Sequence, residues 1–285
     1  MSANPSNNDV RELVKETPGS PASDGDGVRM TRIIGTSELN MLDPFLLLDA
    51  FGSDQPQDYI GGFPSHPHRG FETVTYLLAG RMRHKDNAGN EGVIEPGGVQ
   101  WMTAGRGIVH SEMPEQENGL LMGFQLWVNL PARAKMTAPA YQEYPPSETP
   151  LEQRENGTEI RVIAGSTGLG TRGVVDNDYV RPTYLDVKLP AGETLDQAVG
   201  QEDTAFLYLV DGALEVGDSA AGLDRRTLGI LGPGGRIRVR AAEDSRFLLV
   251  SARPLNEPVA RGGPFVMNTQ AEIVQAFDDY RNNRF

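Results

Sequence analysis

Short apolar runs, some alternating with polar residues and some continuous, recur along most of the chain and are separated by Gly and Pro. Residues 28–34 and 123–130 alternate, whereas residues 45–48 read Phe-Leu-Leu-Leu without a break. Alternation is typical of a strand with one buried face, and a short continuous run is typical of a strand buried on both faces. No sustained helical period occurs between residues 60 and 135, so this region predicts a β-sandwich or a β-barrel.

The same features occur twice in the same order. The segment Tyr-Leu-Leu-Ala-Gly at 76–80 is matched by Tyr-Leu-Val-Asp-Gly at 208–212, and Pro-Gly-Gly at 96–98 is matched at 233–235. In each half, a strand that ends in a glycine turn therefore precedes Pro-Gly-Gly. This repetition predicts a duplicated β-domain and an all-β fold.

Changes in composition set the expected domain boundaries. Residues 1–27 are rich in Ser, Asn, Pro, Gly and Asp, and residues 136–155 are rich in Pro and Glu. Such sequences are typical of tails and linkers. We expect a flexible N-terminal tail at 1–27, a first domain at 28–135, a linker at 136–155, a second domain at 156–262, and a C-terminal segment at 263–285.

The C-terminal segment has the pattern of one amphipathic helix. Thr269 and Glu272 have the spacing of a capping box, in which each side chain bonds the other residue's backbone. Four apolar residues follow at helical spacing and predict a face that packs on the body of the protein: Ile273, Val274, Phe277 and Tyr280. The charged side chains are expected to point outward: Asp278, Asp279 and Arg281.

Charge and cysteine content exclude several classes of function. The chain of 285 residues has a net charge of −13 and no basic stripe, which disfavours direct binding to nucleic acid. It has no cysteine, which excludes disulfides, thiolate metal sites and cysteine nucleophiles. No apolar run reaches the length of a membrane span. We expect a cytoplasmic protein without a membrane partner.

Three of the four histidines lie in two short segments. His66 and His68 can point to one face of a strand, because residues i and i+2 share a face, and His110 and Glu112 can do the same from another strand. Three imidazoles and one carboxylate that face each other form a mononuclear metal site. The remaining histidine, His84, is expected on the surface or in a loop.

Two alternatives remain open around this site. Glu72 lies an even number of residues from His68 and can reach the same face. It is the alternative to Glu112 as the carboxylate ligand, or else it lies behind the site or pairs with Arg69 or Arg106. Three aromatic residues are expected in the core, although a site for a flat aromatic substrate would need aromatic walls: Phe71, Trp101 and Trp127.

The ligand types indicate the chemistry. Imidazole and carboxylate suit Fe, Mn, Ni, Cu or Zn, and four protein ligands leave one or two positions open, which is typical of a catalytic site. No histidine follows His110, so the second half cannot form a histidine-based site. That half is expected to be structural or to bind a partner.

Two long segments resemble the pirin family of the cupin superfamily. They are residues 66–74, which begin His-Pro-His-Arg-Gly, and residues 100–114, which contain Gly-Arg-Gly-Ile-Val-His-Ser-Glu. Residues 43–47 and 263–269 also resemble the family. The resemblance implies two tandem cupin-type β-barrels, or a bicupin, with one metal, usually Fe(II), in the N-terminal barrel. Its implied ligands are His66, His68, His110 and Glu112.

The resemblance also implies an activity. Bacterial members of the family resemble quercetin 2,3-dioxygenases, oxidoreductases that open the ring of a flavonol with O2. In that reaction Glu112, partly released from the metal, is the candidate base. The alternative is a non-enzymatic, iron-dependent regulatory protein that binds a metabolic enzyme or a transcription factor. We expect a monomer, because two barrels can cover each other's open faces.

Overall fold

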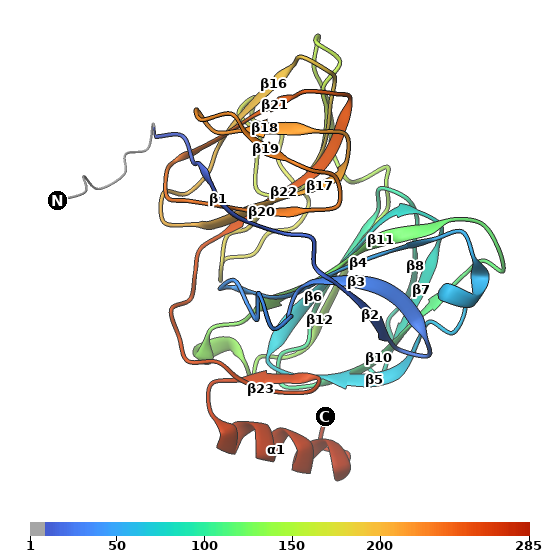
Figure 1. The fold of residues 1–285 in the computed structure, drawn as a ribbon. Helices are drawn as coiled ribbons and strands as arrows, with labels where there is room; N and C mark the ends of the chain where they lie inside the picture. Colours follow the sequence, from blue (N-terminus) through green and yellow to red (C-terminus); the bar gives the residue numbers. More distant parts are fainter. Residues whose placement is uncertain (1–8) are drawn as a thin grey trace. The chain divides into compact units, whose positions relative to one another are not determined.

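The computed structural model describes residues 9–285. Residues Ser20–Ser147 and Leu255–Phe285 form one compact unit, here the first unit, and Glu148–Pro254 with the described residues before Ser20 form the second unit. Each unit contains one seven-stranded and one four-stranded antiparallel sheet (Figure 1). The fold is therefore almost entirely β, with a single α-helix among the described residues.

In the first unit, the strands of the two sheets come from the first half of the chain, between residues 20 and 144. The seven-stranded sheet has the order β12 (Ala140–Tyr144), β9 (Val99–Thr103), β6 (Phe71–Ala79), β11 (Leu121–Asn129), β4 (Phe45–Ser53), β3 (Val28–Ile34) and β2 (Ser20–Asp24). The four-stranded sheet has the order β5 (Phe63–His68), β10 (Ile108–Pro114), β7 (Met82–Asp86) and β8 (Glu91–Ile94). Smaller elements complete the unit: η1 (Pro56–Asp58), η2 (Ala132–Ala134), β23 (Ala260–Gly262) paired with β24 (Phe265–Met267), and α1 (Gln270–Arg281).

The second unit repeats this arrangement. Its seven-stranded sheet has the order β1 (Leu13–Thr17), β20 (Leu228–Leu231), β17 (Thr204–Asp211), β22 (Ser245–Ala252), β15 (Thr183–Leu189), β14 (Glu159–Ala164) and β13 (Leu151–Gln153). Its four-stranded sheet has the order β16 (Thr194–Ala198), β21 (Arg236–Ala241), β18 (Leu214–Val216) and β19 (Ala221–Leu223). The repeated segments 76–80 and 208–212 fall at the ends of β6 and β17, which hold the same place in the two sheets. The predicted duplication is confirmed.

The interiors of the two units differ. In the second unit, Leu195 of β16 packs with Ile237 and Val239 of β21 in one continuous apolar cluster. The corresponding strands of the first unit are β5 and β10, which carry the histidines. Burial of apolar side chains stabilises the second unit at the place where the first unit has imidazoles.

The N-terminal residues do not form the flexible tail that composition predicts. Residues 1–8 lie outside the described part of the chain, but residues 13–17 and 20–24 form β1 and β2. β1 pairs with β20 of the second unit, and the buried Arg11 donates to the carbonyl oxygens of Gly232 and Gly234 at 2.9 and 2.7 Å. β1 and β2 are edge strands, and backbone hydrogen bonds to the neighbouring strand hold them in their sheets although they bury little apolar surface.

The predicted linker and the predicted helix also need correction. Strands β12 and β13 lie inside the predicted linker at 136–155. The capping box of Thr269 and Glu272 is present, but Val274 is 68% exposed, and Ile273 and Ala276 form the buried face. Asp279 does not point outward, because its carboxylate accepts a hydrogen bond from Arg69 at 2.8 Å.

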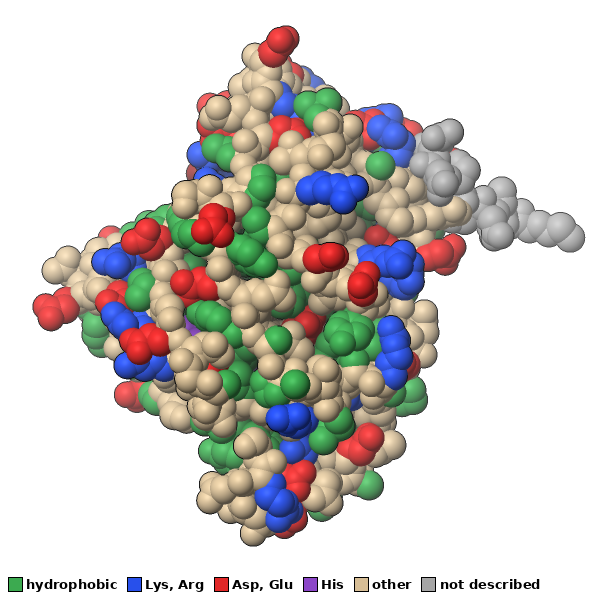
Figure 2. All heavy atoms as spheres, turned by 180° about the vertical axis from the view of Figure 1, so that it is seen from behind, with side chains coloured by type: hydrophobic (Ala, Val, Ile, Leu, Met, Phe, Trp, Pro, Cys, Tyr) green, Lys and Arg blue, Asp and Glu red, His purple; other side chains and the backbone are tan. Residues whose placement is uncertain are grey.

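The surface carries charges of both signs. Figure 2 shows Lys and Arg side chains interspersed with Asp and Glu over the face that it presents, without a continuous basic stripe among the coloured residues there. No helix in the described part of the chain combines the length and the apolar character needed to cross a bilayer.

Candidate metal centre

Strands β5 and β10 bring three histidines together in the first unit. They pair antiparallel, with His110 opposite His66 and Ile108 opposite His68. The nearest ring nitrogens of His66, His68 and His110 lie within 4.8 Å of one another, and the Nε2 atoms of His66 and His68 are 3.0 Å apart. β5 tolerates Pro64 and Pro67 because it is the edge strand of its sheet and needs fewer N–H donors.

Hydrogen bonds orient two of these rings. His66 Nδ1 lies 2.8 Å from the carbonyl oxygen of Pro64, and His68 Nδ1 lies 3.4 Å from that of Pro264. A carbonyl can only accept, so each ring carries its hydrogen on Nδ1 and keeps a lone pair on Nε2. Metal-binding histidines commonly have this arrangement, with one nitrogen bonded to a carbonyl and the other free for the ion.

His84 orients the third ring from behind. Its Nε2 lies 3.2 Å from Asp86 Oδ2, and its Nδ1 lies 3.3 Å from His110 Nδ1. Because the carboxylate accepts from Nε2–H, His84 Nδ1 must accept from His110 Nδ1–H, which leaves a lone pair on His110 Nε2. That Nε2 is buried and has no hydrogen-bond partner in the described residues. It is the kind of atom that a metal ion would satisfy.

The expectation of a surface position for His84 is wrong. This residue is fully buried, and its ring stacks on Tyr141 with the centroids 4.6 Å apart. The register of β7 against β10 places His84 opposite Glu112 and turns both side chains inward. The spacing of His84 and Asp86, which puts both on one face of a strand, was the signal in the sequence that could have revealed this pair.

The electrostatics of the two buried rings, His68 and His110, favour metal binding. Burial lowers the pKa of His68 and of His110 well below the ordinary value, and the neighbouring histidines lower both further. Neutral imidazole is the form that binds a metal. The donor set, its protonation and the orphaned His110 Nε2 therefore fit one metal ion, whose identity they do not fix.

Glu112 is not in the cluster formed by the three histidines, and its carboxylate lies in a hydrogen-bond network with Thr75 and Gln125. Thr75 Oγ1 of β6 lies 2.7 Å from Glu112 Oε1 and 2.6 Å from Gln125 Oε1, and Gln125 Nε2 lies 3.5 Å from Glu112 Oε2. Glu72 instead accepts a hydrogen bond from Thr103 Oγ1 on β9 at 2.7 Å. Glu112 lines the same pocket as His66 and His68, but its role as a metal ligand stays a prediction.

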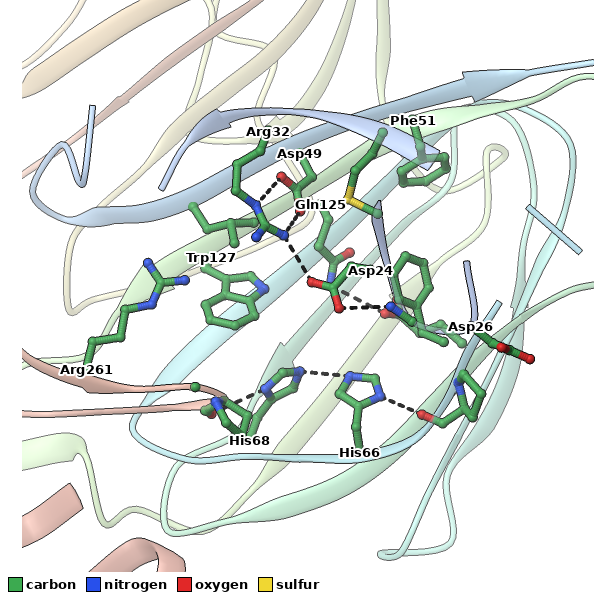
Figure 3. Close-up of a pocket in the computed structure, with 18 residues that line it drawn as sticks. Asp24, Asp26, Arg32, Asp49, Phe51, His66, His68, Gln125, Trp127 and Arg261 are labelled. Atoms are coloured by element: carbon green, nitrogen blue, oxygen red, sulfur yellow. Dashed lines mark hydrogen bonds and ion pairs between the residues drawn. The ribbon is translucent and has the colours of Figure 1, made fainter. Parts of the chain in front are cut away.

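A cavity of about 880 Å³ opens from the histidines between the two sheets of the first unit (Figure 3). This volume is in the range of small-molecule binding sites. Its walls are mainly apolar or aromatic and include Met30, Leu47, Phe51, Phe63 and Trp127. Trp127, which we expected in the core, lines the cavity and contacts His68 with the ring centroids 5.1 Å apart.

Charged residues line the part of the cavity away from the histidines. Arg32 donates to both carboxylate oxygens of Asp49, at 2.9 and 2.8 Å, and to Asp24 at 3.0 Å. Arg261, from β23, lies with its guanidinium carbon 5.1 Å from the ring centroid of Trp127. Sequence reasoning did not find Arg32 or Arg261, because contacts between residues so far apart in the chain leave no local pattern.

Comparison with known proteins matches both units. The model of the family described as Pirin matches residues 27–128, and the model described as Pirin C-terminal cupin domain matches residues 184–285. A pirin-like protein of Caulobacter vibrioides is 54% identical over 97% of this chain and 99% of its own length. A protein of Pseudomonas aeruginosa, provisionally named quercetin 2,3-dioxygenase, is 46% identical over 95% of this chain and 97% of its own.

A solved structure shares the whole fold. The crystal structure of quercetin 2,3-dioxygenase from Acinetobacter baumannii superposes with a TM-score of 0.89 and 36% identity, over 97% of this chain and 98% of that chain. The match confirms the expectation of an all-β protein with two cupin-type domains.

Proposed function

Since this chain belongs to the pirin family, we propose that it is a metal-dependent dioxygenase that opens the ring of a quercetin-type flavonol with O2. The observation that carries the proposal is the convergence of His66, His68 and His110 next to a large, partly aromatic cavity that His66 and His68 line. The names of the relatives from Pseudomonas aeruginosa and Acinetobacter baumannii support the substrate class.

The proposed ligands are the three histidines, through Nε2, and the carboxylate of Glu112. The proposed metal is Fe(II), which would supply Lewis acidity and redox chemistry with O2 when bound. The chain itself supplies neutral imidazoles in fixed orientations, and the apolar walls exclude water from the reacting end of the substrate.

Glu112 is the proposed base for the hydroxyl of the substrate. A hydroxyl carries one hydrogen, so Thr75 can donate either to Glu112 or to Gln125 but not to both at once. When Glu112 is ionised, Thr75 donates to it, and the Gln125 amide must turn so that its Nε2 rather than its Oε1 faces the hydroxyl. When Glu112 holds a proton, its O–H can donate to Thr75, which then donates to Gln125. The network therefore accommodates both protonation states, as a group that takes up and releases a proton requires.

The test is turnover by protein reconstituted with Fe(II) under anaerobic conditions. O2 consumption and the loss of quercetin absorbance are followed together, and bound metal is measured in the same samples. The control is the double variant His66→Ala/His110→Ala, which removes two proposed ligands. Turnover by the parent and none by the control supports the proposal.

Bound iron without turnover of any flavonol would refute the dioxygenase and favour the regulatory alternative, in which the metal changes a surface that a protein partner binds. A protein that binds no metal would refute both functions.

A further inference from the structure

The cavity contains two arginines, and one of them has its charge fully engaged. Arg32 forms a two-pronged ion pair with Asp49 and a further ion pair with Asp24. Such bidentate pairs fix a guanidinium in place and leave little of its charge for a ligand. Arg32 and its partners therefore form a wall of the cavity.

The second arginine, Arg261, has no such partner. Its Nη1 donates to the carbonyl oxygen of Leu46 at 3.2 Å, and it forms no ion pair with any carboxylate of the described residues. A guanidinium has five N–H donors, so most of the donors of Arg261 are left for whatever enters the cavity. Burial and the positive charge of Arg32 lower its pKa, and the nearby carboxylate of Asp49, which is already paired with Arg32, offsets this only in part.

Trp127 connects this cation to the three histidines. The guanidinium carbon of Arg261 lies 5.1 Å from the centre of the Trp127 ring, and the same ring meets His68 edge-on with the centroids 5.1 Å apart. The ring of Phe71 packs against that of Trp127, with the centroids 4.3 Å apart, and holds it in place. Figure 3 shows Trp127 next to Arg261 and above His68.

We propose that Arg261 binds an oxyanion, a carboxylate, sulfonate or phenolate, carried by a planar aromatic ligand at the end away from the three histidines. Trp127, which contacts both Arg261 and His68, lies along the ring system of the ligand, and Phe51 and Phe63 line the same cavity. The inference rests on the proposed function only in identifying the histidines as the reacting end. It narrows the substrate class to aromatic molecules that carry, besides the hydroxyl that reacts near the histidines, an acidic group at the opposite end.

Binding of a matched pair of probes tests this proposal without turnover. 2-Naphthoate and 2-naphthamide have the same ring system and differ in charge at one group. Their dissociation constants are measured by calorimetry with the full-length protein, both loaded with metal and after chelator treatment. Charge-assisted hydrogen bonds make us expect about tenfold tighter binding of the naphthoate.

Three variants complete the test. Arg261→Gln should lose about tenfold in affinity for naphthoate, in both metal states, while its affinity for naphthamide stays unchanged. Arg261→Lys should keep part of the preference. Arg225→Gln, which makes the same charge change at an exposed side chain of the second unit, should behave as the parent.

Equal binding of the two probes by the parent, or naphthoate binding that survives Arg261→Gln in both metal states, would overturn the proposal. Binding of the probes to the chelator-treated protein does not depend on turnover. The proposal for Arg261 and the dioxygenase proposal can therefore fail separately.

Discussion

The Nδ1 atoms of His84 and His110 lie 3.3 Å apart in the interior of the first unit. The one histidine outside the two histidine segments thus contacts a proposed ligand and links it to Asp86. Loss of a hydrogen bond between a metal-binding histidine and a residue behind it typically lowers metal affinity by 10- to 100-fold.

His84→Phe should therefore lower the affinity for a divalent metal by about 10- to 100-fold, because His110 Nδ1–H loses its acceptor and the ring loses its orientation. Competition with a chromophoric chelator measures the affinity. His84→Gln is the matched control, since its side-chain oxygen can still accept a hydrogen bond and should restore part of the affinity. Equal affinity in the parent and in His84→Phe would contradict the role of His84.

Glu112→Gln should lower kcat by about 10²- to 10⁴-fold, because an amide cannot take a proton from the substrate. Thr75→Val, which removes the hydroxyl that bonds Glu112, should have a smaller effect. Steady-state kinetics with metal content determined for each variant separates lost chemistry from lost metal. Full turnover by Glu112→Gln with normal metal content would exclude Glu112 as the base.

Asp279 ties α1 to the loop after β5. The hydrogen bond from Arg69, with those from Gln275 and Arg284, lowers the pKa of Asp279 to about 2, from an ordinary value of 3.8. A carboxyl with a lowered pKa stabilises the fold above its ordinary pKa, and this contribution is lost as the pH falls from about 4 towards 2.

Asp279→Asn should therefore lower the Tm at pH 7 by roughly 2–5 °C, and the difference from the parent should shrink between pH 4 and pH 3. Thermal unfolding followed by circular dichroism at both pH values measures this. Asp278→Asn, whose side chain is 57% exposed, is the control and should change little. A difference between Asp279→Asn and the parent that stays constant down to pH 3 would show that the ion pair is not its cause.

Lys135 is a buried cation whose three hydrogens all have acceptors. Its Nζ donates to the carbonyl oxygens of Gly70 and Val266 at 2.8 and 3.0 Å and to Asn129 Oδ1 at 2.7 Å. Lys135→Met should lower the free energy of unfolding by about 2–5 kcal/mol, because it leaves buried acceptors without a donor.

Urea unfolding measures the effect of Lys135→Met, with Lys188→Met, at a position with 57% of its side chain exposed, as the control. The control should fall within about 1 kcal/mol of the parent. If both variants were equally stable, the three hydrogen bonds would contribute little to the fold.

The sequence predicted those parts of the structure that local patterns determine. The spacing of His66 and His68 placed both rings on one face of β5, and Thr269 with Glu272 marked the start of α1. The repeated glycine turns revealed the duplication, because each turn needs its residue types wherever the strand is placed.

The parts that the sequence did not predict depend on partners far away in the chain. Val274 has the spacing of a buried residue, but the contact of α1 is made by Ile273 and Ala276. His84 is buried because β10 pairs with β7, and Arg261 faces the cavity because β23 returns to the first unit after the whole of the second unit. No local pattern contains this information.

The position of β1 has a consequence for synthesis on the ribosome. β1 is made before the whole first unit, but the strand with which it pairs, Leu228–Leu231, is made about 200 residues later. At a synthesis rate of some 5–20 residues per second, roughly 10–40 s pass between the synthesis of β1 and that of β20. During that time β1 is an unpaired polar strand, and until it docks, β20 is left as an open sheet edge exposed to other chains. The charged Lys15 and Glu16 in β1 suit a segment that must stay unpaired in water without aggregating.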